Sequence, residues 1–437
     1  MSNETMAAGA QSAVAPRSER PVLYLTHDGV LQPLCYSQVV RPILALASRG
    51  VRYALVSLER SADLADVESV RRLEQRLAEA GVTWSYARFR PGAARYPENL
   101  VALAAHAARL ATALGVSAIH ARGFPVGAVA LALHGATGAP ILYDIRGFWI
   151  DNRIEVNGVL ANPLVLRLAR FLEAKLYRRS AAVVSLTELG LDIIRSGHFG
   201  RHRSDQLGVC IPTCVDYDEF RLREPGRFDR APTEVVERLR GRLVVGFVGS
   251  INADYCVSHT LRLFRQVRER RRDAVLLCLT EQGTELREIA RREGVHEDAL
   301  VFHRAHHEDM PSWLERIDWG LLLLVERFAK FASVPTKLGE FFASGVRPLF
   351  YGCNPEVRSW VSRAGSGHVL PDLSDPSLRQ AAEIVASSVH ELDRLKAARQ
   401  RTRDHFDLAT GVDRYEDVLR RMTAGRQYEA PHLETNG

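Results

Sequence analysis

The chain has 437 residues, of which 46% are hydrophobic and 25% are charged. A chain of this length and composition can form two or three soluble globular domains with large cores. The formal net charge of +6 is modest, and much of it comes from Arg residues spread along helical segments, which is typical of solvated helix faces. The sequence contains no nucleic-acid-binding motif, so the charge supports only a weak preference for anionic ligands or an anionic membrane surface.

The sequence shows neither a secretion signal nor a membrane span. Residues 1–20 lack the apolar core of a signal peptide, and no segment has 18 uninterrupted apolar residues. We therefore expect a cytoplasmic protein, and a peripheral contact with the inner face of a membrane stays open. Residues 1–20 and 425–437 have compositions typical of disordered tails.

The six cysteines are scattered along the chain without a CxxC spacing. Most of them lie in apolar runs that are typical of strands, so we expect buried, reduced thiols. Cys35 lies in the loop after the first predicted strand, where a buried thiol is favoured over a catalytic nucleophile.

Short runs rich in β-branched residues alternate with longer amphipathic segments through residues 21–218. Strands are predicted at residues 22–26, 53–58, 82–89, 118–123, 140–146 and 181–187, and the helices between them include residues 66–80 and 97–114. This alternation predicts a parallel sheet covered by helices on both faces. Residues 21–218 are therefore expected to form one doubly wound α/β domain.

The same rhythm restarts after residues 219–242, a charged stretch with prolines that we interpret as a linker. Strands are predicted at residues 243–250, 274–280, 299–305, 319–325 and 347–352. Residues 243–391 are therefore expected to form a second doubly wound domain of similar size. The two domains share a rhythm but no readable sequence repeat.

The stretch SVPTKLGEFFASG, residues 333–345, follows one of these strands and predicts a helix. Ser333 is a candidate N-cap, and Gly345 suits the left-handed position that ends a helix. The apolar residues of the stretch share one buried face, and Lys337 and Glu340 are expected beside that face. A solvated ion pair on the helix surface is one explanation of these two charges.

Ligands of doubly wound sheets bind beyond the carboxyl ends of the strands, where loops open the following helices. Two such domains in tandem place a cleft between two such edges. The amides at the start of helix 333–345 attract anions, and Lys330 and Lys337 lie on either side of this start. An anionic, phosphorylated ligand is therefore a second explanation of the two charges.

Several stretches, taken in chain order, resemble the retaining GT-B glycosyltransferases of family four. They are LYLTHDG, HARG, DIRGFW, VVSLTELG, CIPTCVD, GFVGS and PTKLGEFFASG, and the resemblance covers roughly residues 21–420. It implies two Rossmann-like domains that face each other across a cleft. It also implies that the final helices, expected at residues 392–424, pack back toward the first domain.

By position, the resemblance implies a donor site in the second domain. Glu340 would accept the ribose hydroxyls of a nucleotide sugar, because a carboxylate can bind two neighbouring hydroxyls. Gly249 and Ser250 would bring the backbone close to the pyrophosphate, since glycine permits that approach. Arg304 and Ala305 would lie near the base. The other donor-site candidates are Ser333, Thr336 and Lys337 at the helix start and Gly29, next to Asp28, on a first-domain loop that faces the donor sugar.

The sequence departs from the family pattern around this site. The family has a pair of Glu residues in its signature helix region, and Ala332 replaces the first, so a carboxylate expected near the donor sugar is missing. Ser250 and Tyr255 stand where the family has two cations after the first strand of the second domain. Neutralisation of the phosphates would then fall to Lys330 and Lys337.

The strand end DIRGFW places Arg146 where many members of the family have His. Arg146 could hold a donor or acceptor group, and Asp144 could orient it through a bidentate pair. A structural ion pair at a strand end is the alternative. Arg146, Asp144 and Lys330 are our candidate catalytic residues. His120 and Arg122 end the preceding strand and are expected to face the cleft, with a positioning role left open.

No metal site is predicted. Asp216 and Asp218 mimic a DxD motif, but they lie in the turn at the domain junction. His303, His306 and His307 have no Cys or carboxylate at the spacing of a zinc site. Metal-independent transfer is therefore expected.

The resemblance implies an enzyme that moves a sugar from a nucleotide sugar to an acceptor hydroxyl with retention of the anomeric configuration. It requires no cofactor beyond a UDP- or GDP-linked co-substrate, and its acceptor would be a lipid-linked glycan or a small molecule. The implied role is in bacterial polysaccharide, glycolipid or glycosylated metabolite synthesis. The sequence does not reveal the base, the sugar, the acceptor, the oligomeric state or the effect of Ala332 on activity.

Two alternatives stay open. A nucleotide-sugar 2-epimerase has the same two-domain shape and would need no acceptor. A non-catalytic relative that serves as a scaffold is suggested by Ala332 and by the missing cations.

Overall fold

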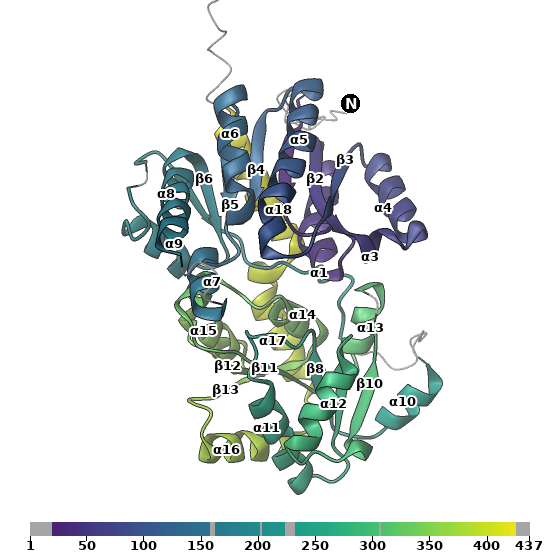
Figure 1. Ribbon diagram of the computed structural model, residues 1–437. Helices are drawn as coiled ribbons and strands as arrows, with labels where there is room; N and C mark the ends of the chain where they lie inside the picture. The colour runs from purple at the N-terminus through teal and green to yellow at the C-terminus, as the bar shows by residue number, and fades with distance from the viewer. Residues whose placement is uncertain (1–19, 158–161, 202, 223–231, 306, 425–437) are drawn as a thin grey trace, which may run out of the picture.

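The computed structural model describes residues 20–157, 162–201, 203–222, 232–305 and 307–424. These residues form two α/β domains, the first above the second in Figure 1, and each domain is built on a parallel sheet with helices on both faces. The two doubly wound, Rossmann-like domains expected from the sequence are confirmed. Residues 1–19 and 425–437, for which disordered tails were predicted, lie outside the described residues.

The first sheet has seven parallel strands within the described residues, in the order β3-β2-β1-β4-β5-β6-β7. The strands are β1 (Val22–Thr26), β2 (Tyr53–Arg60), β3 (Thr83–Phe89), β4 (Ala118–Arg122), β5 (Ile141–Asp144), β6 (Ser180–Ser185) and β7 (Leu207–Cys210). The order reverses where β1 lies between β2 and β4, with Val22 paired to Tyr53 on one side and to Ala118 on the other. Ligands of doubly wound sheets bind at such a reversal.

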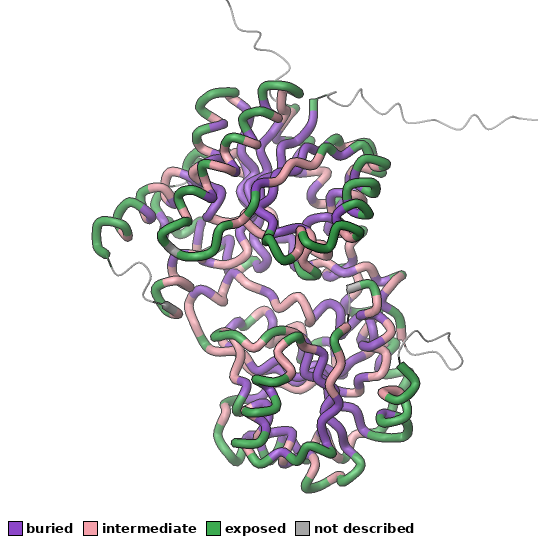
Figure 2. The backbone as a smooth tube through the Cα atoms, turned by 45° about the vertical axis from the view of Figure 1, so that its right-hand side comes forward, coloured by how far each residue is buried: buried purple, intermediate pink, exposed green. Residues whose placement is uncertain are grey.

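Helices cover both faces of this sheet, so every residue of β1 is buried and the strand reads as a continuous apolar run (Figure 2). The longer helices are α2 (Arg41–Ser48), α4 (Val67–Glu79), α5 (Tyr96–Leu114), α6 (Gly127–Thr137), α7 (Trp149–Asn157), α8 (Pro163–Arg179) and α9 (Glu188–Arg195). Short helical turns are α1 (Pro33–Cys35), η1 (Tyr36–Val40), α3 (Ser61–Leu64), η2 (Ala93–Arg95) and η3 (Phe124–Val126).

The second sheet has six parallel strands within the described residues, in the order β10-β9-β8-β11-β12-β13. They are β8 (Val244–Val248), β9 (Val275–Leu279), β10 (Leu300–His303), β11 (Trp319–Leu323), β12 (Arg347–Tyr351) and β13 (His368–Val369). The helices of this domain are α11 (Val257–Arg270), α12 (Gly283–Arg292), α13 (Met310–Leu314), α14 (Thr336–Ser344), α15 (Pro355–Ala364) and α16 (Asp375–Ser387), with the turns η4 (Glu297–Ala299), η5 (His307–Asp309) and η6 (Phe328–Ala332). The stretch interpreted as a linker contains a helix, α10 (Thr233–Leu239).

Two chain segments connect the domains, and they run side by side. The Val215 amide donates to the Phe406 carbonyl at 2.8 Å, and the Leu408 amide donates to the Val215 carbonyl at 2.9 Å. Helix α17 (Leu392–Phe406) comes directly before the second of these segments and packs on α14 and α15 of the second domain. The last described helix, α18 (Leu408–Ala424), packs on α2, β4, β6 and β7 of the first domain, so α17 and α18 together span both domains (Figure 1).

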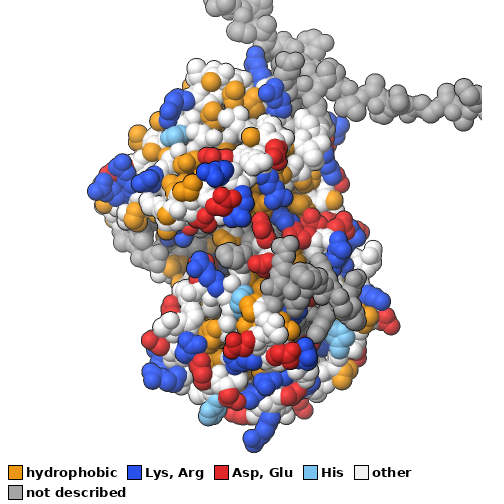
Figure 3. All heavy atoms as spheres, turned by 90° about the vertical axis from the view of Figure 1, so that its right-hand side faces the viewer, with side chains coloured by type: hydrophobic (Ala, Val, Ile, Leu, Met, Phe, Trp, Pro, Cys, Tyr) orange, Lys and Arg blue, Asp and Glu red, His pale blue; other side chains and the backbone are white. Residues whose placement is uncertain are grey.

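The surface carries both signs of charge. On the face shown in Figure 3, basic and acidic side chains are interspersed over both domains.

Within the described ranges, none of the helices combines the length and the hydropathy that a membrane span requires. All six cysteines lie in these ranges as free thiols, and burial raises the pKa of Cys35 to about 12.

Candidate functional site

A cleft of about 870 Å³ lies between the two domains in the described part of the chain. Its first-domain wall comes from the loops after β1, β2, β4 and β5, and its second-domain wall comes from the loops after β8 to β12 and from the start of α14. The carboxyl ends of both sheets therefore open into the same space. Its volume lies within the range of small-molecule sites.

The start of α14 lies at the centre of the second-domain wall. Pro335 is the N-cap residue, and no side chain of a described residue caps the helix. The first amides of α14 therefore point toward a cleft that Pro335, Thr336 and Lys337 line. The prediction of Ser333 as N-cap was wrong, because the helix begins after Pro335, and the Ser333 hydroxyl instead donates to the Arg146 carbonyl at 3.0 Å. Gly345 ends the helix with a φ of 73°, as predicted.

The ion pair between Lys337 and Glu340 borders the cleft. Lys337 Nζ lies 3.0 Å from Glu340 Oε2, and both residues line the cavity. Glu340 is only 3% exposed, so the expectation of a carboxylate beside the buried face was wrong. α14 is enclosed by α13, α17 and β12, and this packing buries all residues from Leu338 to Ser344. A surface pair therefore does not describe the Lys337–Glu340 contact.

Lys330 also lines the cleft, in the turn η6 just before α14. Its Nζ lies 2.7 Å from Asp254 Oδ2, and Arg327 Nη1 donates to Asp254 Oδ1 at 3.2 Å. Asp254, in the loop after β8, was not singled out from the sequence. Its carboxylate ties this loop to η6, so the two loops of the second-domain wall are held together by charge-assisted hydrogen bonds.

A single amide side chain fixes the backbone between η6 and α14. Asn354 is 4% exposed, and its Nδ2 donates to the carbonyls of Lys330, Phe331 and Ser333 at 3.0–3.1 Å. Its Oδ1 accepts from the amides of Glu356 and Val357 and thereby caps α15. Sequence reasoning missed Asn354, although an Asn before a Pro that starts a helix is a recognisable capping signal.

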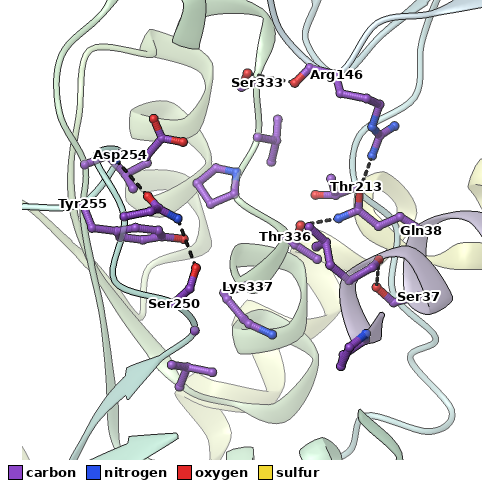
Figure 4. Close-up of a pocket in the computed structure, with 18 of the residues that line it drawn as sticks. Ser37, Gln38, Arg146, Thr213, Ser250, Asp254, Tyr255, Ser333, Thr336 and Lys337 are labelled. Carbon is purple, nitrogen blue, oxygen red and sulfur yellow. Dashed lines mark hydrogen bonds between the residues drawn. The ribbon is translucent and has the colours of Figure 1, made fainter. Parts of the chain in front are cut away.

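Arginines and a glutamine form the first-domain wall. Arg122 Nη1 lies 2.7 Å from Asp28 Oδ2, and Gln38 Oε1 accepts from Arg122 Nη2 at 3.1 Å and from Arg146 Nη2 at 2.7 Å. The amide nitrogen of Gln38 donates across the cleft to Thr336 Oγ1 at the start of α14 (Figure 4). Gln38 therefore connects both arginines to the second domain. It was not predicted, because nothing around it in the sequence marks this contact.

Asp144 lies beneath this wall and does not line the cleft. It is 1% exposed, and it accepts a hydrogen bond from the Tyr415 hydroxyl of α18 at 3.0 Å. A single contact of 3.5 Å joins Arg146 Nη1 to Asp144 Oδ1, so the bidentate pair expected from the sequence was wrong. Burial favours the neutral carboxyl group, but Arg146, His120 and Arg122 outweigh this and hold the pKa of Asp144 at about 2. Asp144 can therefore position Arg146 but does not face a ligand.

The residues proposed to face the diphosphate and the base also line the cleft. Gly249 has a φ of 119°, a backbone conformation that residues with a side chain rarely adopt. A Cβ at this position would meet no atom within 4 Å, so glycine is required by the backbone conformation and not by a lack of space. Ser250 lies beside Tyr255 on the same wall (Figure 4). Arg304 and Ala305 line the far end, where Arg304 Nη2 pairs with Glu281 Oε1 at 3.0 Å.

Gly29, His120 and Ala332, which were singled out from the sequence, do not line the cleft in the described structure. A Cβ at the position of Gly29 would lie 2.8 Å from Glu59 Oε2, so a larger residue would disturb the Glu59 side chain. The other oxygen of this carboxylate, Glu59 Oε1, accepts a hydrogen bond from the Val30 amide. His120 is buried below the wall, next to Asp144. Ala332 is fully buried against Gly190 of α9, so the position of the missing carboxylate is part of a contact between the two domains.

The aspartates that mimic a DxD motif serve the domain junction. Asp216 Oδ1 accepts from the amides of Asp218 and Glu219, and Asp218 Oδ1 pairs with Arg403 at 3.2 Å. The His303 ring packs against the Trp313 ring at a tilt of 35°, while His306 and the His307 side chain lie outside the described part. Among the residues that the structure describes, no group of three potential ligands could hold a metal ion.

Residues 37–207 match the glycosyl transferase 4-like domain family. A search of curated proteins found no match. Among solved structures, sucrose-phosphate synthase from Thermosynechococcus elongatus superposes with a TM-score of 0.69 at 13% identity, over 93% of this chain and 100% of that one. HepE of Anabaena in complex with UDP-glucose superposes with a TM-score of 0.64 at 14% identity, over 92% of this chain and 99% of HepE. A candidate UDP-N-acetylglucosamine 2-epimerase from Listeria monocytogenes superposes with a TM-score of 0.58 at 10% identity, over 95% of this chain and 99% of the epimerase chain.

These similarities agree with the geometry. The family match covers the domain that carries the arginine wall, and the structural similarity extends over both domains and the cleft between them. The chain therefore has the two-domain GT-B fold, and residues 37–207 of its first domain are similar to the glycosyl transferase 4-like domain family.

Proposed function

We propose that the protein is a glycosyltransferase that binds a nucleotide sugar in the second-domain half of the cleft. The observation that carries this proposal is the start of α14, where free amides, the Lys337 ammonium group and the buried Glu340 carboxylate meet on one wall. Amides and cations suit a diphosphate, and a carboxylate suits the two hydroxyls of a ribose. The diphosphate would lie between α14 and Gly249, with the base toward Arg304 and Ala305.

The donor is proposed to be a UDP sugar, with a GDP sugar as the second choice. HepE of Anabaena, which shares the fold, is described in complex with UDP-glucose. No further cofactor is proposed, because the cleft presents both the cations for a diphosphate and the carboxylate for a ribose.

The reaction is proposed to proceed with retention, on the donor face next to the leaving group. The acceptor oxygen forms a bond to the anomeric carbon as the bond from that carbon to the diphosphate breaks, and the acceptor proton passes to a phosphate oxygen. Negative charge grows on the leaving diphosphate, where the α14 amides, Lys330 and Lys337 would stabilise it. Arg146, held by Gln38 and Asp144, would contact the sugar or the acceptor from the opposite wall.

The first-domain wall would bind the acceptor. Among the residues that the structure describes, this wall presents four arginines, Arg60, Arg122, Arg146 and Arg153, but two carboxylates, Asp28 and Asp63. Asp28 pairs with Arg122, and Arg153 forms no ion pair with a described residue. This excess of positive charge favours an acceptor that carries phosphate or carboxylate groups. A lipid-linked glycan or a phosphorylated small molecule, as used in bacterial glycan or glycolipid synthesis, fits this requirement.

Incubation with UDP, GDP and ADP sugars, with and without candidate acceptors, tests the proposal. The transferase predicts nucleoside diphosphate release that depends on the acceptor, and a product whose anomeric configuration, read by NMR, equals that of the donor. Release of nucleotide and sugar without any acceptor would instead indicate the 2-epimerase. A protein that binds none of the nucleotides would fit the scaffold.

A further inference from the structure

Helix α8 turns apolar side chains toward the solvent. Leu164, Leu168 and Phe171 are 71%, 58% and 60% exposed, and their spacing of four and three residues places them on one outward face of the helix. Val165, 48% exposed, lies at the edge of this face. The opposite side of α8 packs on α6 and on the sheet, so the outward face has no partner among the described residues. A surface helix ordinarily has polar residues there.

The charges around this apolar face are positive. Arg167, Arg178 and Arg179 are exposed on α8, and Lys175 is partly exposed. Glu173, the acidic residue of the helix, is buried and is bound by Arg170 Nη1 at 2.7 Å. The outward surface of α8 therefore combines large apolar side chains with exposed guanidinium groups and has no exposed carboxylate of its own.

α8 is fixed to the mouth of the cleft. Arg170 donates to both carboxylate oxygens of Asp151 in α7, at 3.0 and 2.5 Å. This bidentate pair is rigid, because a guanidinium group and a carboxylate match in shape. α7 in turn supplies Trp149 and Arg153 to the first-domain wall of the cleft. Figure 1 shows α8 at the outer edge of the first domain, with α7 between it and the second domain.

We infer that the outward face of α8, comprising Leu164, Val165, Leu168 and Phe171 with Arg167, Arg178 and Arg179, docks on an anionic lipid bilayer. Such a helix lies in the plane of the membrane, with apolar side chains among the acyl chains and cations at the anionic headgroups. Because the Arg170–Asp151 pair joins α8 to α7, this docking would hold the acceptor half of the cleft at the membrane surface. An acceptor anchored in the bilayer could then enter beside Trp149 and Arg153.

A second copy of the chain is the competing occupant of this face. An isologous contact would bring two faces together that both carry Arg167, Arg178 and Arg179 and no exposed acidic residue of α8. Like charges would repel each other in that contact, whereas an anionic bilayer neutralises them. The charge of the face therefore favours the bilayer.

Co-sedimentation of the full chain with lipid vesicles tests this inference. One set of vesicles contains phosphatidylcholine alone, and the other contains equal parts of phosphatidylcholine and phosphatidylglycerol. The wild type should bind the anionic vesicles at least about tenfold more strongly, and added salt should weaken this binding. The double variant Leu168→Glu/Phe171→Glu should lose at least about tenfold in binding to anionic vesicles. The double variant Arg178→Glu/Arg179→Glu should lose the preference for the anionic lipid.

Val101→Glu is the matched control, because Val101 is 69% exposed on α5 and lies on another helix. It should bind vesicles like the wild type, and melting curves verify that all variants are folded. Wild-type protein that stays in solution with both kinds of vesicle overturns the inference. It is also overturned if wild-type protein forms a dimer that Leu168→Glu/Phe171→Glu splits while vesicle binding is absent. Nucleotide binding is measured separately in solution, so a failure here leaves the proposed function standing.

Discussion

Lys330 and Lys337 carry similar charges but have different partners at the start of α14. Lys330 is held by Asp254 on the loop after β8, and Lys337 is held by Glu340 within the helix. An ammonium group has three protons, so each lysine can keep its carboxylate and still donate to a phosphate. Lys330 lies on the turn before the helix, from which its side chain can reach an anion that the amides also face, and we expect it to be the main contact with the diphosphate.

This expectation can be measured with Lys330→Ala and Lys337→Ala. Each variant should bind UDP about 10- to 150-fold more weakly, since one charge-assisted hydrogen bond is worth about 1.5–3 kcal/mol. The loss should be smaller for UMP, which lacks the second phosphate, and larger for Lys330→Ala than for Lys337→Ala. Lys396→Ala, at an exposed position of α17, serves as the control. Equal losses for UDP and UMP would place the lysines away from the second phosphate.

His405 makes stability depend on pH. It stacks on Trp360 with 4.1 Å between the ring centroids, and its burial, with help from Arg414 and Arg363, lowers its pKa from 6.5 to about 4. The unfolded chain therefore takes up this proton before the folded chain does, and the free energy of unfolding should fall as the pH drops from 6.5 to 4. His405→Gln should make the urea midpoint less dependent on pH within this window. A slope identical to that of the wild type would show that His405 does not titrate there.

At the scale of elements, burial decides which parts could be predicted from the sequence. The long strands are buried on both faces, so their apolar runs stand out, and the predicted strands lie within a few residues of those observed. β7 and β13 were missed because they are short and have few β-branched residues. The site was harder to predict, because its contacts join distant segments. Gln38 meets Arg122, Arg146 and Thr336, and the burial of Glu340 depends on α17.

The turn η6 is positioned by a side chain of the next strand-to-helix loop. Asn354→Ala removes the bonds to three carbonyl groups near Lys330 together with the cap of α15. We expect it to lower the free energy of unfolding by about 2–4 kcal/mol, because a cap is lost and buried carbonyls are left unsatisfied. It should also weaken UDP binding, since Lys330 is no longer fixed.

Asn162→Ala is the matched control for Asn354→Ala. Asn162 caps α8 by accepting the Leu164 amide at 2.9 Å, but it is exposed and lies outside the cleft. Asn162→Ala should lower the free energy of unfolding by about 1 kcal/mol and leave nucleotide binding unchanged. If urea titrations give the same cost for both variants, Asn354 acts as a helix cap alone.

At the scale of the whole molecule, the domain junction occupies the residues that mimic a metal motif. Asp216 caps a turn, and Asp218 pairs with Arg403 of α17, so both carboxylates already stabilise the crossing between the domains. Transfer should therefore persist in EDTA, with cations of the cleft in the place that a metal ion has in other sugar transferases. An activity lost in EDTA and restored by Mg²⁺ or Mn²⁺ would contradict this prediction.

The two domains meet in one cleft, and the central claim is that its second-domain wall binds a nucleoside diphosphate through Glu340. Calorimetric titration of UDP, GDP and ADP into the wild type, Glu340→Gln and Glu68→Gln tests this claim most directly. Glu68 forms an exposed pair with Arg71 at the same i,i+3 spacing, does not line the cleft, and is the matched control. Because Glu340 is buried, melting curves accompany the titrations. We predict that the wild type binds one of the three nucleotides, that Glu340→Gln weakens this binding about 10- to 150-fold, and that Glu68→Gln leaves it unchanged. Equal affinity in the wild type and a folded Glu340→Gln variant, or no binding of any of the three nucleotides by the wild type, would contradict the claim.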